Sequence, residues 1–331
     1  MDLDAFSAVR EPRWQRLKRL GSMRRLTGAE ADEFTRLYQH TATDLAIVRS
    51  SAPDPAIVSR LSVLLANSRA SLAGAREPVW REFARFLAWR FPAALYRLRW
   101  WTVATMVGFI AVAVAVGVHT AGNPEVLAQL GSEADRQEYA ETAFASYYSE
   151  NPSLSFFGRV WTNNAWVAAF TIAGSFTGVI PLYVQYQNAV GVGDAAAMMH
   201  EFGYLDIFFQ LIAPHGLLEL TAVWVAGAAA FKLFWTILAP GPRPRMRAMA
   251  EEGRAMFGVA LGLVLVQFVS GIIEGFVTGS ALPWAVKIAI GISALAGFWV
   301  YVLVAGRRAW RAGFTGDVGD ESRESIAATS G

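Results

Sequence analysis

Five ionisable side chains interrupt long apolar stretches of this 331-residue chain, and they are the residues best suited to chemistry: His215, Glu219, Lys232, Glu274 and Lys287. Ionisable groups inside a membrane are costly, so they are candidates for function by default. His215 and Glu219 are four residues apart and therefore share one face of a helix. We expect a buried polar cluster in which Glu219 or Glu274 pairs with His215 or Lys287.

The same residues have a simpler interpretation, in which they tie helices together. Polar contacts between membrane helices are worth around 0.6 kcal/mol on average and also fix the register of the helices. Three asparagines, Asn163, Asn164 and Asn188, are expected to reach the same leaflet as the cluster. The two interpretations are compatible, and the sharper one is a cluster that faces a partner or a substrate.

Sequence motifs of catalytic and metal-binding sites are missing. His200-Glu201 is followed by Gly203 and Tyr204 rather than by the second histidine of a zinc-protease helix, and the chain has no cysteine. No glycine-rich phosphate loop ends in Gly-Lys-Ser/Thr, and Ser270 lies in no nucleophile motif. We therefore expect no enzyme activity, no metal site and no cofactor.

The composition predicts an all-α, polytopic membrane protein. Hydrophobic residues make up 54% of the chain, which takes it out of the soluble class. A helix must cross about 30 Å of hydrocarbon to span a membrane. Stretches of sufficient length lie near 101–118, 163–197, 214–239, 257–279 and 284–305, so that residues 101–306 form the expected membrane domain.

The second of these stretches is interrupted by Gly174, Gly178 and Pro181. Broken helices are tolerated at membrane depth only where they are buried in protein or line a wet cavity. We predict a helical hairpin, with one arm at 163–177 and the other at 180–197, and a single broken helix is the alternative.

Arginine distribution predicts the orientation. The loop 119–161 is acidic and has only Arg136 and Arg159, whereas the loop 240–256 carries four arginines. The positive-inside rule places the basic loop and the polar tail 307–331 on the cytoplasmic side, provided that the hairpin supplies an extra crossing. Both termini are then cytoplasmic. Residues 198–212 mix aromatic with charged side chains and predict an amphipathic helix on the outer surface.

Residues 1–98 are predicted to form a basic, cytoplasmic helical domain. Capping signals and apolar spacing indicate helices near 3–20, 28–50, 55–74 and 78–98. Residues 79–100 interleave aromatic side chains with arginines, which is typical of a helix at a lipid headgroup boundary. The adjoining membrane helix explains the positive charge and no nucleic-acid recognition motif is present, so we expect membrane lipids, and no nucleic acid, as a partner.

The hexapeptide from Pro214 through His215 and Gly216 to Glu219 resembles the Pro-His-Gly-x-x-Glu signature of the stage II sporulation protein M family. Other features of the chain are similar to that family as well. They are the pair Asn163-Asn164 that opens an apolar helix, the break at Gly174 and Gly178, and Asn188 with the glycines that follow it. The resemblance covers nearly the whole chain.

The resemblance implies a multi-spanning membrane protein without known catalytic activity of its own. In spore formers the family is best described as a subunit of a complex with cell-wall hydrolases that remodels septal peptidoglycan. In many other bacteria, similar proteins accompany a MoxR-type ATPase. Our leading hypothesis is a non-enzymatic membrane scaffold that engages envelope hydrolases or a MoxR-type ATPase complex, and a homo-oligomer is left open. The alternative is a transporter or channel-like protein with an intramembrane polar site.

Overall fold

The computed structural model describes residues 3–318, apart from 24–25, 52–53, 73–78 and 150–153. The chain divides into two compact units, Met1–Phe83 and Ala84–Gly331. Every regular element among the described residues is a helix. The fold is therefore all-α, as the sequence predicts.

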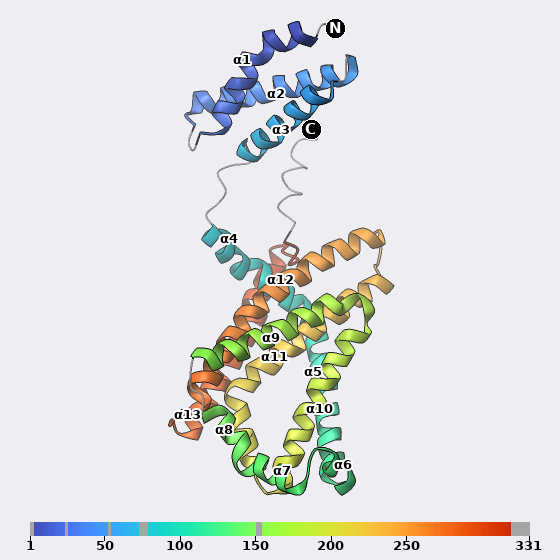
Figure 1. Ribbon diagram of the computed structural model, residues 1–331, viewed down its shortest axis with the longest axis vertical. Coiled ribbons are helices and arrows are strands. Elements are labelled where there is room, and N and C mark those ends of the chain that lie inside the picture. The colour runs from blue at the N-terminus through green and yellow to red at the C-terminus, as the bar shows by residue number, and fades with distance from the viewer. Residues whose placement is uncertain (1–2, 24–25, 52–53, 73–78, 150–153, 319–331) are drawn as a thin grey trace. The chain divides into compact units, whose positions relative to one another are not determined.

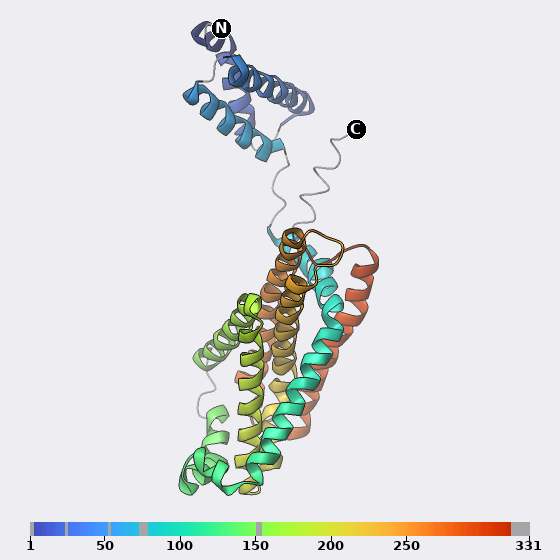
Figure 2. The same ribbon diagram turned by 90° about the vertical axis from the view of Figure 1, so that its right-hand side faces the viewer.

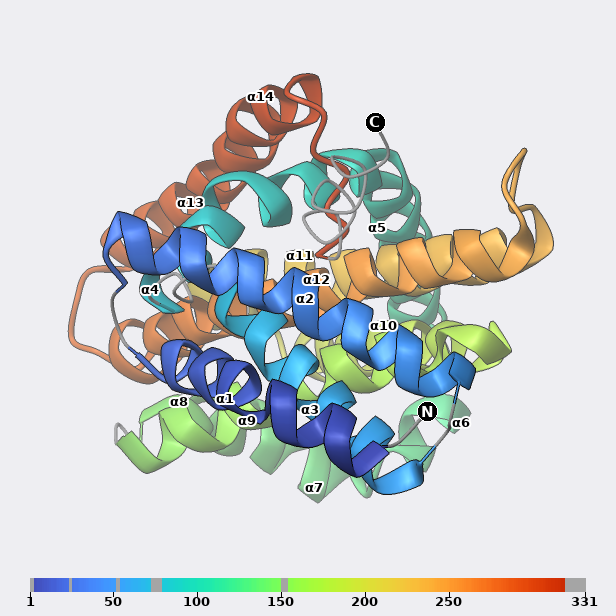
Figure 3. The ribbon, with the colours of Figure 1, turned by 90° about the horizontal axis from the view of Figure 1, so that it is seen from above.

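Three helices that pack against one another form the amino-terminal unit: α1 (Leu3–Gly21), α2 (Gly28–Ser51) and α3 (Pro55–Leu72), seen in blue in Figure 3. Their bounds agree with the prediction. The expected capping box is present, since the backbone N–H of Thr27 donates to Glu30 at 2.8 Å and that of Glu30 donates to Thr27 Oγ1 at 3.4 Å. The buried core of this unit includes Trp14 and Leu61.

Four helices of the structure are long and apolar enough to span a membrane, counting only the described residues: Val79–Ala121, Leu205–Leu238, Arg245–Thr278 and Trp284–Arg311. The first comprises α4 (Val79–Arg85), a π-helical turn η1 (Phe86–Arg90) and α5 (Phe91–Ala121). The second is α11. The third comprises α12 (Arg245–Ile272) and the π-helix η4 (Ile273–Thr278). The fourth comprises α13 (Trp284–Val300), the π-helix η5 (Tyr301–Ala305) and α14 (Gly306–Arg311). These helices support a polytopic membrane protein.

The segment that is predicted to form a helical hairpin reverses direction (Figure 1). The helix α9 (Leu154–Ala173) ends in a short 3-10 turn, η3 (Gly174–Thr177), and α10 (Val179–Glu201) follows. Gly178 has a φ of 67°, a left-handed conformation that favours glycine, and the Phe234 ring covers it so closely that a Cβ would lie 2.8 Å away. Figure 1 shows α9 oblique to α10, so the chain forms a hairpin of two unequal arms.

Residues 198–212 do not form the separate surface helix that the sequence predicts. Residues 198–201 complete α10, the chain turns at Gly203 with a φ of 82°, and residues from Leu205 onward begin α11 (Leu205–Leu238). The aromatic face of this segment meets protein, because Phe208 is buried and stacks on Phe144 with ring centroids 5.7 Å apart. The amphipathic pattern is real, but its apolar side is covered by the chain itself.

Short helices gather at one end of the membrane unit, where Figure 1 shows α6 and α7 below α10. They are α6 (Pro124–Gln129), α7 (Glu133–Glu138), the π-helical turn η2 (Tyr139–Ala143) and α8 (Phe144–Ser149). We call residues 122–149 the platform. Basic segments lie at the opposite end of the unit. This end contains the start of α12 and also α14, which continues α13 (Figure 2).

Close backbone approach holds the long helices together. Along α10, Gly193 lies so near α5 that an added Cβ would be 2.6 Å from the Ala113 carbonyl oxygen. The buried face of α11 is rich in alanine, as small residues let membrane helices approach. At the basic end, Arg97 donates to Glu252 at 2.8 Å and Arg254 to Asp317 at 2.6 Å. The first residues of the predicted tail 307–331 are therefore ordered and packed, and residues 319–331 lie outside the described residues.

Candidate functional site

Residues of the signature hexapeptide lie inside one continuous helix. Pro214 occurs within α11, where it cannot donate a backbone hydrogen bond to the preceding turn. Helix α13 packs closely here, since a Cβ on Gly291 would lie 2.5 Å from the Pro214 carbonyl oxygen. His215 and Gly216 are buried, and His215 and Glu219 project from the same face one turn apart. The proline and glycines thus shape the helix that presents these two side chains.

The third member of the site comes from a π-helix. Helix α12 continues into η4, in which Glu274 and Thr278 are both buried. Single turns of π-helix are frequent at functional sites because the wider turn re-aims the side chains around it. Here the wider turn carries Glu274 towards α11.

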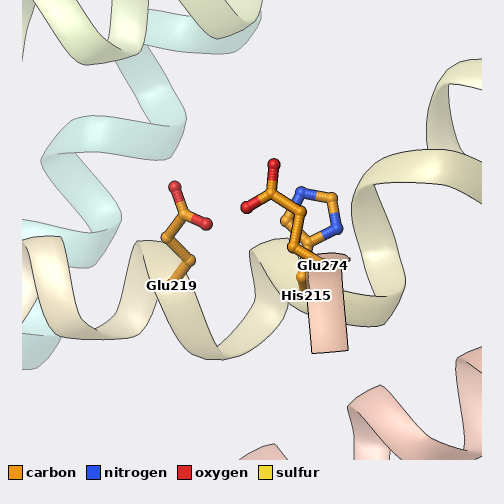
Figure 4. Close-up of side chains that lie close together, drawn as sticks. All are labelled: His215, Glu219 and Glu274. Atoms are coloured by element: carbon orange, nitrogen blue, oxygen red, sulfur yellow. The ribbon is translucent and has the colours of Figure 1, made fainter. Parts of the chain in front are cut away.

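His215, Glu219 and Glu274 form what we call the cluster. One nitrogen or oxygen from each side chain lies within 4.8 Å of the other two, and Figure 4 shows the carboxyl group of Glu274 between the imidazole ring and the carboxyl group of Glu219. His215 is 5% exposed and Glu274 is 4% exposed. The Oε2 atoms of both glutamates are buried and have no hydrogen-bond partner among the described residues. An arrangement of one imidazole and two carboxyl groups can hold a metal ion or share protons.

Polar side chains surround the cluster. His215 Nδ1 is 3.0 Å from Thr278 Oγ1, and the Ser270 hydroxyl donates to the His215 carbonyl oxygen at 3.1 Å. Asn164 and Ser270 are polar neighbours of the Glu219 carboxyl group. From the platform, the Tyr148 ring lies against the imidazole with centroids 5.4 Å apart. Helices α8, α9, α11 and α12 with its π-helical end therefore all contribute to the site.

The structure brings together only part of the predicted set. Asn164 joins the cluster, whereas Asn163 is exposed and the Asn188 amide donates to Val184 in its own helix at 2.8 Å. Lys287 Nζ donates to the Thr278 carbonyl oxygen at 2.7 Å. Among the described residues no lysine or arginine forms an ion pair with Glu274, so the expected glutamate–lysine pair is replaced by a bond from lysine to the backbone of η4.

The predicted structural residues lie around the break and the start of the signature: Gly174 and Gly178 in the turn between α9 and α10, Pro181 buried in the first turn of α10, and Pro214 and Gly216 in α11.

Three residues at the site were not predicted, namely Tyr148, Ser270 and Thr278. Ser270, Glu274 and Thr278 recur every four residues, a spacing that could have indicated one polar face. Tyr148 is far from the signature along the chain, and no local pattern marks it.

The platform is fixed to the membrane helices by a bidentate ion pair. Arg136 is buried and donates from Nε and Nη2 to the two carboxyl oxygens of Glu201, both at 2.8 Å. The hydrogen bonds from Arg136 lower the pKa of Glu201 below its usual value. Burial raises the pKa of Tyr148, so this hydroxyl stays protonated. Phe144, Tyr148, Met199 and Phe208 complete the apolar contact.

Family models match parts of both units. A model of a domain of unknown function, the DUF8413 family, matches residues 4–74. The stage II sporulation protein M model matches residues 102–279, which is more than half of the chain and includes all three residues of the cluster. No curated protein and no solved structure matches the chain. The chain is therefore a membrane protein that belongs to the stage II sporulation protein M family.

Proposed function

We propose that this protein is a non-enzymatic subunit of a cell-envelope complex, which presents the platform outside the membrane to a peptidoglycan hydrolase. The observation that carries this proposal is that the long connection after the first span is folded into short helices and packed against α10 and α11. Arg136 is buried beneath it and bonded to Glu201, and the stacked Phe144 and Phe208 rings join it to α11. A connection that only linked two helices would need no such anchoring.

The charge of the platform indicates the chemistry of its partner. Its acidic side chains are all exposed: Glu125, Glu133, Asp135, Glu138 and Glu141. Its single arginine, Arg136, is buried and neutralised by Glu201. The exposed charge is therefore negative throughout, which favours a partner domain with a basic surface.

The opposite end of the unit supports a cytoplasmic assignment for both termini. Helices α12 and α14 carry most of the arginines that follow the first span, including Arg245, Arg247 and Arg308. Under the positive-inside rule this end faces the cytoplasm and the platform faces outward. A MoxR-type ATPase would meet the protein on the basic side, and lipid headgroups would contact the exposed arginines there.

Single cysteines test this orientation, since the native chain has none. Ala134 in α7 and Met246 in α12 are both exposed, so A134C and M246C form a matched pair. We expect a membrane-impermeant maleimide added to intact cells to label A134C and to spare M246C. The reverse pattern would invert the topology and end the proposal.

Partner binding is tested by reversing charge on the platform. The variant E138K/E141K reverses two exposed carboxylates, and D32K, which reverses one exposed carboxylate of α2, is the control. After gentle detergent purification from the native host, we expect peptidoglycan hydrolase activity in a gel assay to accompany wild type and D32K. That activity should fall at least about tenfold with the platform variant, as interface charges steer association. Equal recovery with all three proteins would count against the platform as the docking surface.

A transporter is the second candidate, favoured by one observation. The helical break at Gly174–Gly178 occurs in the same unit as two buried glutamate oxygens without partners, a combination that transporters use to build a site. Solute or ion flux in vesicles that contain the purified protein alone, abolished by Glu219→Gln, would replace the scaffold proposal. If no flux is seen and the hydrolase still copurifies with the protein, the scaffold proposal is supported.

A further inference from the structure

In the membrane unit, the buried Glu274 and the half-buried Glu219 lie beside the buried His215. Each glutamate has one buried carboxyl oxygen with no hydrogen-bond partner among the described residues. We propose that His215, Glu219 and Glu274 bind one divalent transition-metal ion, for which Zn²⁺ is the first probe. The inference rests on the cluster alone and not on the platform or its partner. It also revises the expectation from sequence, which excluded zinc because the motif at His200-Glu201 is incomplete.

The distances fit a single ion. One ligand atom from each residue lies within 4.8 Å of the others, so an ion between them can approach all three with small side-chain movements. Zinc binds imidazole nitrogen and carboxylate oxygen at about 2.0–2.2 Å. In Figure 4 the two carboxyl groups and the imidazole edge face the same space. The unpaired Oε2 atoms of Glu219 and Glu274 are the natural carboxylate ligands.

The imidazole is held in the form that binds a metal. Thr278 Oγ1 lies 3.0 Å from His215 Nδ1 and also donates to the Ile273 carbonyl oxygen at 3.3 Å. Because a hydroxyl has one proton, this second bond makes the oxygen an acceptor for a proton on Nδ1. Nε2 then carries a lone pair and is free to face the carboxylates. Histidines that bind metals almost always donate from their other nitrogen in this way.

Charge balance also favours a cation. Within the described residues no arginine or lysine pairs with Glu219 or Glu274, and Lys287 is engaged with the Thr278 carbonyl oxygen. In contrast, Glu252 on the same helix, α12, is buried and paired with Arg97. Buried carboxylates are expected to be paired or to coordinate metal. A divalent ion would neutralise both glutamates and join α11 to η4.

The ligand set selects the class of ion. Calcium and magnesium prefer shells made of oxygen atoms only, whereas an imidazole with carboxylates suits zinc and its first-row neighbours. Three protein ligands leave at least one position for water or for an oxygen from a neighbouring residue. Asn164 and Ser270 are polar neighbours of the Glu219 carboxyl group, and the Tyr148 ring lies against His215.

Metal content of the full-length protein in detergent is the first test. Protein is stripped with a chelator, dialysed against Zn²⁺ and analysed by mass spectrometry of the metal. We expect about one zinc per chain for wild type and for His200→Ala, which removes an exposed histidine of the same unit. The variants E219Q, E274Q and H215A should lose at least about a hundredfold in affinity. Thr278→Val, which acts through His215, should lose about 10–100-fold.

Two further measurements use the wild-type protein and therefore do not require that any variant folds. Zn²⁺ should raise the thermal unfolding temperature of chelator-treated wild type, whereas Mg²⁺ should not, because an ion that binds only the folded state stabilises it. Co²⁺ should give the visible absorption bands of a site with nitrogen and oxygen ligands. The proposal is overturned if wild type binds no more zinc than E274Q, or if Zn²⁺ and Mg²⁺ shift unfolding equally. The first result would show that Glu274 is not a zinc ligand, and the second that the cluster does not select a transition-metal ion.

Discussion

The amino-terminal and membrane units bury carboxylates in opposite ways. In the amino-terminal unit, Asp44 is 5% exposed and accepts hydrogen bonds from Arg10 Nε and Trp14 Nε1, both at 2.9 Å. In the membrane unit, Glu219 and Glu274 each keep a buried oxygen with no partner. Both carboxyl oxygens of Asp44 thus accept hydrogen bonds within the fold, whereas one oxygen of each glutamate accepts none from the described residues.

The difference is not a simple property of the membrane unit. Glu252 lies in α12, the helix that continues into η4 and Glu274. It is 1% exposed, and Arg97 donates a hydrogen bond to it at 2.8 Å. Buried acids at the basic end and in the amino-terminal unit therefore follow the usual rule that buried charge is paired. Departures from that rule concentrate at functional sites. The contrast distinguishes the cluster from the other buried acids, and for this reason we propose it as the functional site.

The largest expected loss of stability is at Asp44, the buried carboxylate whose hydrogen bonds are all formed within the fold. Asp44→Ala removes the acceptor for Trp14 and leaves Arg10 unpaired, and breaking a buried pair costs about 3–5 kcal/mol. We expect faster hydrogen exchange in α1 and α2 of the full-length protein, measured by mass spectrometry. Asp32→Ala, on the exposed face of α2, is the control and should change exchange little. Similar exchange in both variants would remove the contrast between the units.

A second contrast concerns packing. The amino-terminal core uses large side chains, whereas α10 and α5 meet at Gly193, where a Cβ would lie 2.6 Å from the Ala113 carbonyl oxygen. Gly193→Leu overpacks this contact and should destabilise the membrane unit by about 3 kcal/mol. Gly191→Leu is the matched control, because a Cβ there meets nothing within 4 Å. Thermal unfolding in detergent that failed to separate the two variants would show that the helices can move apart freely.

A smaller effect is expected where the platform joins the membrane helices. Arg136→Ala removes two charge-assisted hydrogen bonds to Glu201 and should cost about 2 kcal/mol. The platform should then open more often, which hydrogen exchange of residues 124–149 would detect. Gln137→Ala, an exposed neighbour, serves as control. No difference in platform exchange would show that apolar contacts alone hold it.

The same ion pair predicts a pH dependence. The pKa of Glu201 is lowered in the folded protein, so the pair stabilises the fold fully above the ordinary glutamate pKa of about 4.3. This contribution is lost as the pH falls through the lowered value, when the carboxylate takes up a proton. Platform exchange in wild type should therefore rise towards that of Arg136→Ala in acid. A constant difference between the two proteins down to that pH would contradict the assignment.

The smallest effect on folding is expected at the cluster itself. Glu274→Gln keeps the shape of the side chain and breaks no ion pair that the structure shows, so the metal-free protein should lose less than about 1 kcal/mol of stability. Glu252→Gln, which breaks the pair with Arg97, should cost more. Thermal unfolding after chelator treatment compares them. A larger loss of stability for Glu274→Gln than for Glu252→Gln would show that the cluster has a structural role, and Glu274 would then no longer differ from Glu252.

The sequence determined what depends on neighbours along the chain. Caps such as Thr27 with Glu30 fixed helix bounds, and the glycines at 174 and 178 marked the reversal between α9 and α10. Apolar length indicated four of the five predicted spans, all except 163–197. The spacing of His215 and Glu219 placed them on one face, because four residues make about one helical turn. All of these signals are local, and the structure retains them.

Tertiary structure alone decided which distant residues meet. Glu274 reaches His215 through the register of α12 and its π-helical end, while Lys287 binds the backbone at Thr278 instead of a glutamate. Tyr148 arrives from the platform, and residues 205–212 join α11 because Phe144 covers Phe208. Each outcome depends on the angle and register of packed helices. Side-chain periodicity determines the face of a helix but not the helix that it will meet.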